Sequence, residues 1–526
     1  MATNTSHSHI VSVGQVFTPI TWAEWLLLRW GVFDAWITGA SVCDPTAGEG
    51  VFALALFRLA RARGIAVKPE MLVKLTLIEV QPTRLEAFRV KASGDFGIEF
   101  PNSNLFAQDI ITEPHPCKYD ILVGNPPWAN FTDLPPSYKE QLKPFFVAEG
   151  LVPDKKRVLL GSSRTDIAAL VLKVVLGRLL GEEGFGCFYL PSSLFFGDDA
   201  HIGFRDYTAN HRFFSVDEVC EFTLSRVFDG VGTSYCCARF QMDVQQSFPV
   251  RYFRESSGDW IEHSAMPLKR PDDQWRVLEH GDNSCFDGPL GIELDATQKP
   301  RQGVNTCGAN SVFIFDRKPS HLPSEYLYPL ATKEVWREGN GEPHKWILLP
   351  YDAKTGRPLP WSKIEEITEL RDYLNGNRGL LQSRKGTLIQ SAISKGLWWS
   401  LLGVGPYSFA PYKVIWEAYG QKQFRPIRLH EFSGHVWQAN QAMHAFIPCW
   451  SEKDAKRIQE GLLNPDILSL LRQLNGDGKC NWAQPGKIQK ILAYETPQSH
   501  QPLLCAERRE ECRTRGSSVR RVPRRR

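Results

Sequence analysis

Three acidic residues of this sequence follow one another at intervals that suit the binding of a nucleoside. Asp44 opens segment 44–50, whose glycines let the backbone pass close to a ligand and which leads into an expected helix with free N–H groups. Glu79 ends the next apolar run, where a carboxylate can accept hydrogen bonds from both hydroxyls of a ribose, and Asp109 ends the third, where it can meet an adenine amino group. Each acid alone also fits a solvated strand end, but together they favour a nucleoside cofactor.

The most specific segment is 125–128, Asn-Pro-Pro-Trp, at the end of the fourth apolar run. Two consecutive prolines lack N–H donors and keep the segment stiff, which fixes the Asn125 side-chain oxygen and the Pro126 carbonyl as outward acceptors. Pro127 and the broad ring of Trp128 follow them. Two acceptors beside an aromatic face suit a planar group with an NH2, because accepting both amino hydrogens directs the nitrogen lone pair toward a methyl donor. In isolation, the segment also fits an Asn-Pro turn with a buried Trp.

Alternating apolar runs and amphipathic stretches position these residues, and they predict an α/β fold, a parallel sheet with helices on both faces. The expected strands are 41–43, 72–78, 104–106, 119–123, 186–190, 216–222 and 234–241. The expected helices are 22–30, 51–63, 82–92 and 166–180, with a later one at 452–473. From about residue 282 to 323 Gly, Pro, Asn and Ser become frequent, which indicates a domain boundary.

On these residues the chain resembles the S-adenosylmethionine-dependent adenine-N6 DNA methyltransferases of the gamma arrangement, in which cofactor motifs precede an Asn-Pro-Pro-aromatic motif and a target-recognition domain follows. The resemblance implies a class I methyltransferase Rossmann-like sheet, S-adenosyl-L-methionine as cofactor and double-stranded DNA as partner, as in restriction-modification or related defence systems. It implies direct transfer to the N6 amino group of an adenine flipped out of the duplex. A separate restriction endonuclease or defence-system subunit stays open as a further partner.

The resemblance also gives the expected domains their roles. We expect a flexible N-terminus at 1–12, a catalytic domain at 13–282, a mixed α+β DNA-recognition domain at 283–500 and a disordered Arg-rich tail at 501–526.

Individual roles follow from the positions that match the family's motifs. Asn125, Pro126, Pro127 and Trp128 match the catalytic motif, with Trp where Tyr or Phe is more usual. Phe228 matches an aromatic residue that packs on the flipped base beside Trp128, although a core Phe fits this position equally. The residues implied to bind the cofactor are Phe17, Thr18, Pro19, Asp44, Pro45, Ala47, Gly48, Gly50, Glu79, Asp109, Asn125 and Asp166.

The charge of the chain locates the expected DNA contacts. The total of +4 comes from the tail, where residues 501–526 hold nine Arg and three Glu. Segment 371–428 holds nine basic and two acidic residues, interleaved with aromatic ones, which suits phosphate contact and stacking. The residues that we expect to contact DNA are Arg384, Lys385, Lys413 and Arg425. For any one of them, a solvated basic face is the structural alternative.

Composition excludes several other classes of protein. The chain has 526 residues, 42% of them hydrophobic, which is too apolar for a disordered protein. No apolar run reaches the ~18 residues of a membrane span, and the polar N-terminus does not resemble a signal peptide. Twelve Cys without a CxxC pair suit a reducing cytoplasm and argue against a zinc ribbon. His7 and His9 have no further ligands nearby, so no metal is expected.

Three other functions share parts of the pattern. Glutamine-N5 protein methylation fits the same pocket, but those enzymes are short and lack a large following domain. Cytosine-N4 DNA methylation usually has Ser or Thr where Asn125 stands. A non-catalytic DNA-binding subunit that retains the fold is opposed by intact Asp44, Glu79, Asp109 and Asn125.

Overall fold

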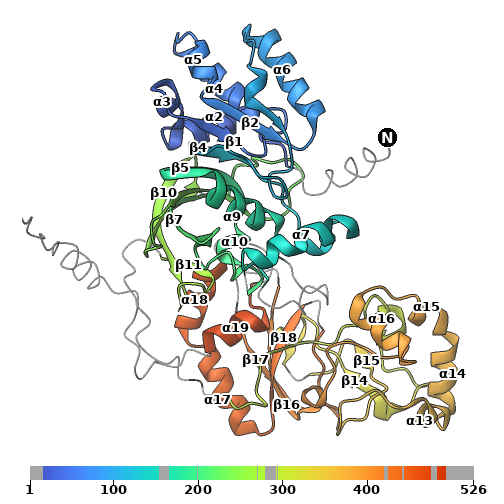
Figure 1. Ribbon diagram of the computed structural model, residues 1–526. Coiled ribbons are helices and arrows are strands. Elements are labelled where there is room, and N and C mark those ends of the chain that lie inside the picture. Colours follow the sequence, from blue (N-terminus) through green and yellow to red (C-terminus); the bar gives the residue numbers. More distant parts are fainter. Residues whose placement is uncertain are drawn as a thin grey trace, which may run out of the picture. The chain divides into compact units, whose positions relative to one another are not determined.

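The computed structural model describes residues 16–152, 165–197, 199–268, 270–278, 292, 294–339, 341–419, 424–440, 443–475 and 482–492. The chain divides into two compact units, of which the first runs to Asn283 and the second from Ser284 to His500. Figure 1 shows that both units combine helices with sheet. Within the described ranges, no helix has both the length and the apolar composition needed to cross a lipid bilayer.

Unit 1 is built on one long sheet, with strands in the order β3-β2-β1-β4-β5-β8-β7-β9-β10-β11. The first five of these are parallel to one another, and β8 lies antiparallel between β5 and β7. The strands are β1 Val42–Asp44, β2 Leu75–Glu79, β3 Leu105–Ala107, β4 Tyr119–Gly124, β5 Leu180–Pro191, β6 Thr208–Ala209, β7 Arg212–Glu221, β8 Tyr235–Met242, β9 Val250–Ser256, β10 Asp259–Pro267 and β11 Trp275–Leu278.

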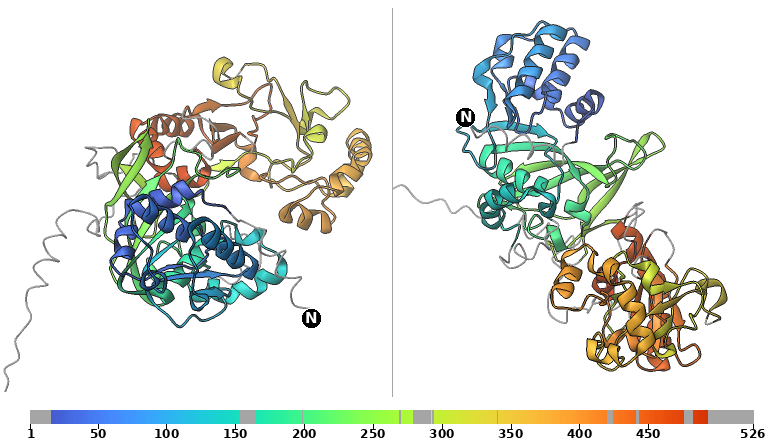
Figure 2. Two further views of the ribbon diagram at one scale, coloured as in Figure 1. Left: turned by 90° about the horizontal axis from the view of Figure 1, so that it is seen from above. Right: turned by 90° about the vertical axis from the view of Figure 1, so that its right-hand side faces the viewer.

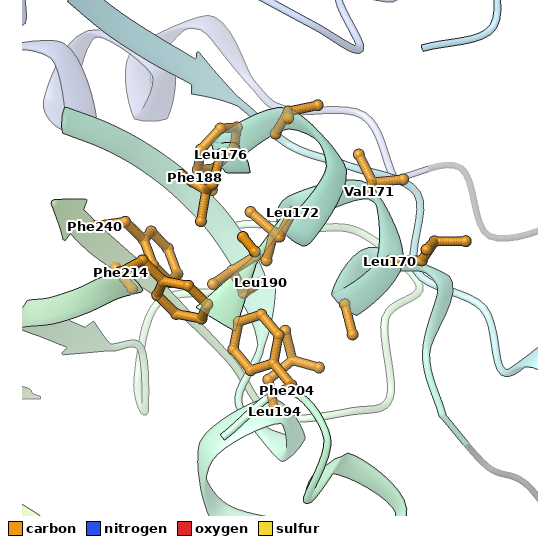
Figure 3. Close-up of a cluster of buried hydrophobic side chains, with 14 of the residues drawn as sticks. Leu170, Val171, Leu172, Leu176, Phe188, Leu190, Leu194, Phe204, Phe214 and Phe240 are labelled. Atoms are coloured by element: carbon orange, nitrogen blue, oxygen red, sulfur yellow. The ribbon is translucent and has the colours of Figure 1, made fainter. Parts of the chain in front are cut away.

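Neighbouring residues of the central strands point to opposite faces of the sheet and enter two separate hydrophobic cores. In β4, Leu122 joins one core, whereas Ile121 and Val123 join the other. In β5, Phe188 and Leu190 belong to the first core, which Figure 3 shows between this strand and the helix that precedes it. Both faces are therefore covered, which explains why these strands read as continuous apolar runs.

Helices supply the other side of each core. Residues of α2, α3, α4 and α6 pack in one core, and those of α7 and α9 in the other. The blue helices and the teal helices accordingly lie on different faces of the sheet (Figures 1 and 2). Their bounds are α2 Ile20–Arg29, α3 Val32–Ile37, α4 Val51–Ala62, α5 Pro69–Leu72, α6 Pro82–Phe96, α7 Pro136–Ala148, α9 Ile167–Leu179 and the short α10 Ser193–Phe196.

The expected α/β class, a Rossmann-like sheet with helices on both faces, is confirmed. Several bounds differ from the prediction. Strand β5 begins at Leu180, directly after α9, and not at residue 186. The expected helix 452–473 is two helices, α17 Glu452–Leu462 and α18 Pro465–Asn475, because Pro465 has no N–H to continue the first.

Unit 2 has two small antiparallel sheets and many short helices. The first sheet has the order β12-β18-β16-β17 and the second the order β13-β15-β14. The strands are β12 Arg301–Gln302, β13 Ile314–Phe315, β14 Leu327–Pro329, β15 Trp346–Leu348, β16 Tyr412–Glu417, β17 Ile427–Leu429 and β18 His444–Cys449. The helices besides α17 and α18 are α11 Asn310–Phe313, α12 Val335–Glu338, α13 Trp361–Glu365, α14 Thr368–Gly376, α15 Arg378–Gln382, α16 Thr387–Ser394 and α19 Pro485–Leu492.

Candidate functional site

A cavity in unit 1 lies at the carboxyl ends of β1, β2, β3 and β4. Ligands of open α/β sheets bind at this edge, where the strand order reverses. The predicted residues that line the cavity are Phe17, Thr18, Asp44, Pro45, Ala47, Gly48, Glu79, Asp109, Asn125 and Pro127. The fold therefore brings together predicted residues that lie up to about a hundred positions apart in the sequence.

The loop after β1 depends on its glycines. Gly48 and Gly50 have φ angles of 55° and 71°, which side chains rarely adopt. A Cβ atom on Gly50 would lie 2.3 Å from Cδ2 of Phe88, so the close packing of this loop on α6 requires glycine there. Gly50 itself is the N-cap of α4 and does not line the cavity. Its role is to let the loop turn into the helix.

The two acids at the ends of β2 and β3 are fixed by backbone N–H groups. Oε2 of Glu79 accepts from Gly48 N at 2.9 Å, and Oε1 accepts from Gln81 N at 3.0 Å. Oδ1 of Asp109 accepts from Ile111 N at 2.9 Å. Each carboxylate oxygen has two acceptor positions, so both acids retain capacity for a ligand.

Asp44, at the end of β1, is fully buried beside these acids. Its Oδ1 accepts from Thr46 N at 3.2 Å, and a Cβ atom on Gly124 would lie 3.1 Å from this oxygen. Glycine at 124 thus leaves room for the carboxylate between β1 and β4. Burial raises the pKa of Asp44 to about 8, and the charge of Glu79 adds to this increase.

The amide of Asn125 has a defined orientation. Nδ2 donates to the Val16 carbonyl at 3.0 Å and to Oγ1 of Thr18 at 3.1 Å. Because a carbonyl can only accept, the NH2 must face Val16, and Oδ1 must face the other way. Oδ1 is buried and has no hydrogen-bond partner among the described residues. A buried acceptor without a donor is costly, so this oxygen is suited to a ligand N–H.

Asp166 does not line the cavity and instead ties the loop after Asn125 to α9. Its Oδ1 accepts from Ala168 N at 2.9 Å as the N-cap of that helix, and from Ala129 N at 3.2 Å. Ile167 N donates to the Ala129 carbonyl at 2.8 Å. Burial raises the pKa of Asp166 to about 7. Its position thus supports the Asn-Pro-Pro-Trp segment from outside the cavity.

The rings of Trp128 and Phe228 are in contact. Their ring centroids are 5.0 Å apart with an interplanar angle of 83°, and Tyr235 packs against both. Both rings are buried, with exposed fractions of 8% and 3%, and neither lines the cavity. In this arrangement neither ring is accessible for stacking. Pro126 and Pro19 also do not line the cavity.

Among the residues of the cavity wall that the prediction missed, Arg84 and Tyr138 stand out by their chemistry. Arg84 lies in the first turn of α6. Among the described residues that line the cavity, it is the one with a basic side chain. Tyr138, in α7, faces the same space near Asp109, and burial raises the pKa of its hydroxyl. Arg84 follows Glu79 by five residues, and Pro136 at the start of α7 is a helix-initiation signal, so both had a sequence signature.

Two of the four expected DNA contacts are buried in unit 2. Arg384 has an exposed fraction of 4%, and its guanidinium donates to the carbonyls of Leu381, Thr306, Ser400 and Trp398. Lys413 has an exposed fraction of 2% in β16, with Nζ donating to the Ala410 carbonyl at 3.1 Å. The prediction that these two side chains contact DNA is therefore wrong, because their donors serve the protein interior.

The other two expected contacts, Lys385 and Arg425, are exposed. Lys385 directly follows the buried Arg384. The main-chain carbonyl of Arg425 accepts a hydrogen bond from the indole N–H of Trp336. Both side chains thus remain accessible to a partner.

No arrangement of three or more His, Cys, Asp or Glu suited to a metal ion occurs in the described part of the chain.

No family model matches the sequence, and no curated protein matches it. Solved structures do match at low identity. The type IIL restriction-modification enzyme MmeI in complex with DNA is 13% identical with a TM-score of 0.49, over 82% of this chain and 60% of that one. A nuclease-deletion mutant of the type ISP restriction-modification enzyme LlaGI, bound to a DNA substrate mimic, is 13% identical with a TM-score of 0.47, over 82% and 42%.

A third match is the methyltransferase subunit of a type I restriction-modification system from Streptococcus thermophilus. It is 18% identical with a TM-score of 0.32, over 47% of this chain and 50% of that one. The chain spans less than two thirds of the length of each of these three proteins.

Proposed function

We propose that this protein transfers a methyl group from S-adenosylmethionine to the N6 amino group of a flipped adenine in a specific sequence of double-stranded DNA, as part of a restriction-modification or related defence system. The observation that carries the proposal is the orientation of Asn125, whose buried Oδ1 lacks a donor while its NH2 is anchored on the protein. An exocyclic NH2 supplies the missing donor.

The residues of the cavity fit the proposed cofactor. Glu79 and Asp109 offer carboxylate oxygens to hydroxyl and amino groups, and the loop 44–50 lets the backbone pass close to a ligand. The bound cofactor would supply an electrophilic methyl group. Asn125 would accept from the target amino group and align its nitrogen for the transfer, while Pro127 and the acids fix the two reactants relative to each other.

The target base must leave the duplex to reach Asn125, which costs a few kcal/mol. Stacking on Trp128 would return roughly 1–3 kcal/mol. Because Trp128 and Phe228 pack edge-to-face and both rings are buried, the base can stack on either ring only after this part of the site opens. Lys385 and Arg425 stay the proposed phosphate contacts in unit 2, and Phe228 stays the proposed second stacking residue.

Incubation with methyl-labelled S-adenosylmethionine and mixed unmethylated DNA, followed by digestion to nucleosides, tests the proposal. We expect label in N6-methyladenine with the wild-type protein and a rate lower by roughly 10²–10³-fold with Asn125→Ala. Label in N4-methylcytosine would replace the proposed base, label only in protein would replace the substrate class, and binding to DNA without any label would indicate a non-catalytic subunit.

A further inference from the structure

Residues 16–18, here called the strap, contact two different parts of the site. Val16 and Thr18 accept the two hydrogen bonds from Nδ2 of Asn125. Phe17, between them, lies against α6, where Cζ of Arg84 is 5.3 Å from the centroid of its ring. The strap therefore joins the catalytic amide to a helix that borders the cofactor cavity.

The contacts continue from Arg84 to the acid proposed to bind the ribose. Nε of Arg84 donates to Oε1 of Gln81 at 2.9 Å, and Gln81 N donates to Oε1 of Glu79 at 3.0 Å. The other oxygen of Glu79 accepts from Gly48 N. A continuous series of contacts thus leads from the cofactor loop, through Arg84 and Phe17, to Asn125.

The strap needs such a support. Phe17 has an exposed fraction of 66%, so burial does little to hold it in place. Val16 and Thr18 can orient the Asn125 amide only while the strap itself keeps its position. A guanidinium over an aromatic face is attractive, and Arg84 is itself fixed by Gln81.

We propose that Arg84 is a positioning residue, which holds the strap through Phe17 and thereby couples occupation of the cofactor site at Glu79 to the orientation of Asn125. This inference rests on the proposed function. Arg84 touches neither Asn125 nor the target base in this role. It acts on the rate of methyl transfer through the amide that it helps to orient.

Rates in matched variants test the coupling. Arg89, also on α6, has a side chain 41% exposed and pairs with Glu86 outside the cavity, so Arg89→Met is the control for Arg84→Met. Single-turnover methylation of unmethylated DNA is measured at saturating S-adenosylmethionine, with the dissociation constant of the cofactor measured separately. We expect Arg84→Met to slow the transfer about fivefold, from the strength of an exposed cation–π contact, and Arg84→Lys and Arg89→Met to stay within about twofold of the wild type.

A double-mutant cycle separates positioning from a direct effect on the cofactor. In the Asn125→Ala background, Arg84→Met should cause no further loss, because the amide that it orients is gone. A wild-type rate in Arg84→Met, or the same fivefold loss in both backgrounds, would overturn the inference.

Hydrogen exchange gives a readout that does not depend on methylation. We expect S-adenosylmethionine to slow amide exchange in the peptide that contains the strap in the wild type and in Arg89→Met, and to have no such effect in Arg84→Met. A wild type that shows this protection but labels no DNA would contradict the proposed function and leave the coupling intact. A wild type that methylates DNA without protection of the strap would overturn the coupling alone.

Discussion

Replacing Asn125 by Asp separates the presence of an acceptor from its orientation. Asn125→Asp keeps an oxygen where Oδ1 lies, but it removes the donor that bonds Val16 and Thr18 at 3.0 and 3.1 Å. The new oxygen would face a carbonyl that can only accept, so the group must rotate or repel the strap. If the proposed role is right, an intact acceptor in a lost orientation should be nearly as harmful as no acceptor.

The expected magnitude follows from the loss of one preoriented polar group at a reacting centre, about 2.7–4 kcal/mol of transition-state stabilisation. The single-turnover rate should therefore fall by roughly 10²–10³-fold. The affinity for S-adenosylmethionine should change little, because Glu79 and Asp109 keep their backbone donors. Rates at saturating cofactor and a separate cofactor titration distinguish these two quantities.

Asn130→Ala is the matched control, since this exposed amide lies in the same loop and bonds only the side chain of Asp133 in the contacts described. It should retain the wild-type rate. An Asn125→Asp protein that methylates within about tenfold of the wild type, with unchanged thermal stability, would refute the reasoning. The orientation of the amide would then not limit the transfer.

Further expectations concern the buried charges. Asp44→Asn should raise the melting temperature of unit 1 at pH 8. The pKa of Asp44 is about 8 in the folded state and 3.8 ordinarily, so the wild type loses up to about 6 kcal/mol of folding stability as pH rises between these values, which melting curves from pH 5 to 9 check. Arg384→Met should cost roughly 4 kcal/mol of stability by leaving four carbonyls without their donor, whereas Lys385→Gln should leave melting unchanged and lower the salt dependence of DNA binding by about one ion. Lys413→Met should stabilise unit 2 by about 1–4 kcal/mol at pH 7 without affecting DNA binding. Because burial lowers the pKa of Lys413 to about 7, the wild type should regain folding stability as pH rises from 7 toward 10.5, whereas the variant should not, and calorimetry measures this difference.

The fold of unit 1 was predictable because its central strands are buried on both faces. Val42–Asp44, Leu75–Glu79 and Tyr119–Gly124 therefore appear as apolar runs, and the polar residue at the end of each run marks the edge where ligands bind. Strands β9 to β11 escaped prediction; in β9, Val250–Ser256, only Val250, Tyr252 and Phe253 are buried, and two Arg interrupt the apolar residues. Such a strand does not differ locally from an irregular polar segment.

The failure at Arg384 has a different cause. Residue type predicts a cation that seeks phosphate, but four main-chain carbonyls converge on this side chain, from Thr306 to Ser400. That convergence is a property of the tertiary structure of unit 2 and leaves no local mark. Arg84 was missed for the opposite reason, because its neighbours were recognisable but its contact with Phe17 spans 67 residues.

The edge-to-face contact of Trp128 and Phe228 has a consequence for the size of the substrate. If Trp128 and Phe228 receive the base as proposed, the buried rings must first become accessible at a cost in free energy, and a free adenine nucleoside brings only its own stacking to offset that cost. A long duplex also brings many phosphates, and their attraction to a basic surface grows with the number of contacts. The closed ring pair should therefore make the protein prefer long DNA over monomers. We expect it not to methylate adenosine or short oligonucleotides, even at concentrations that saturate the cofactor cavity.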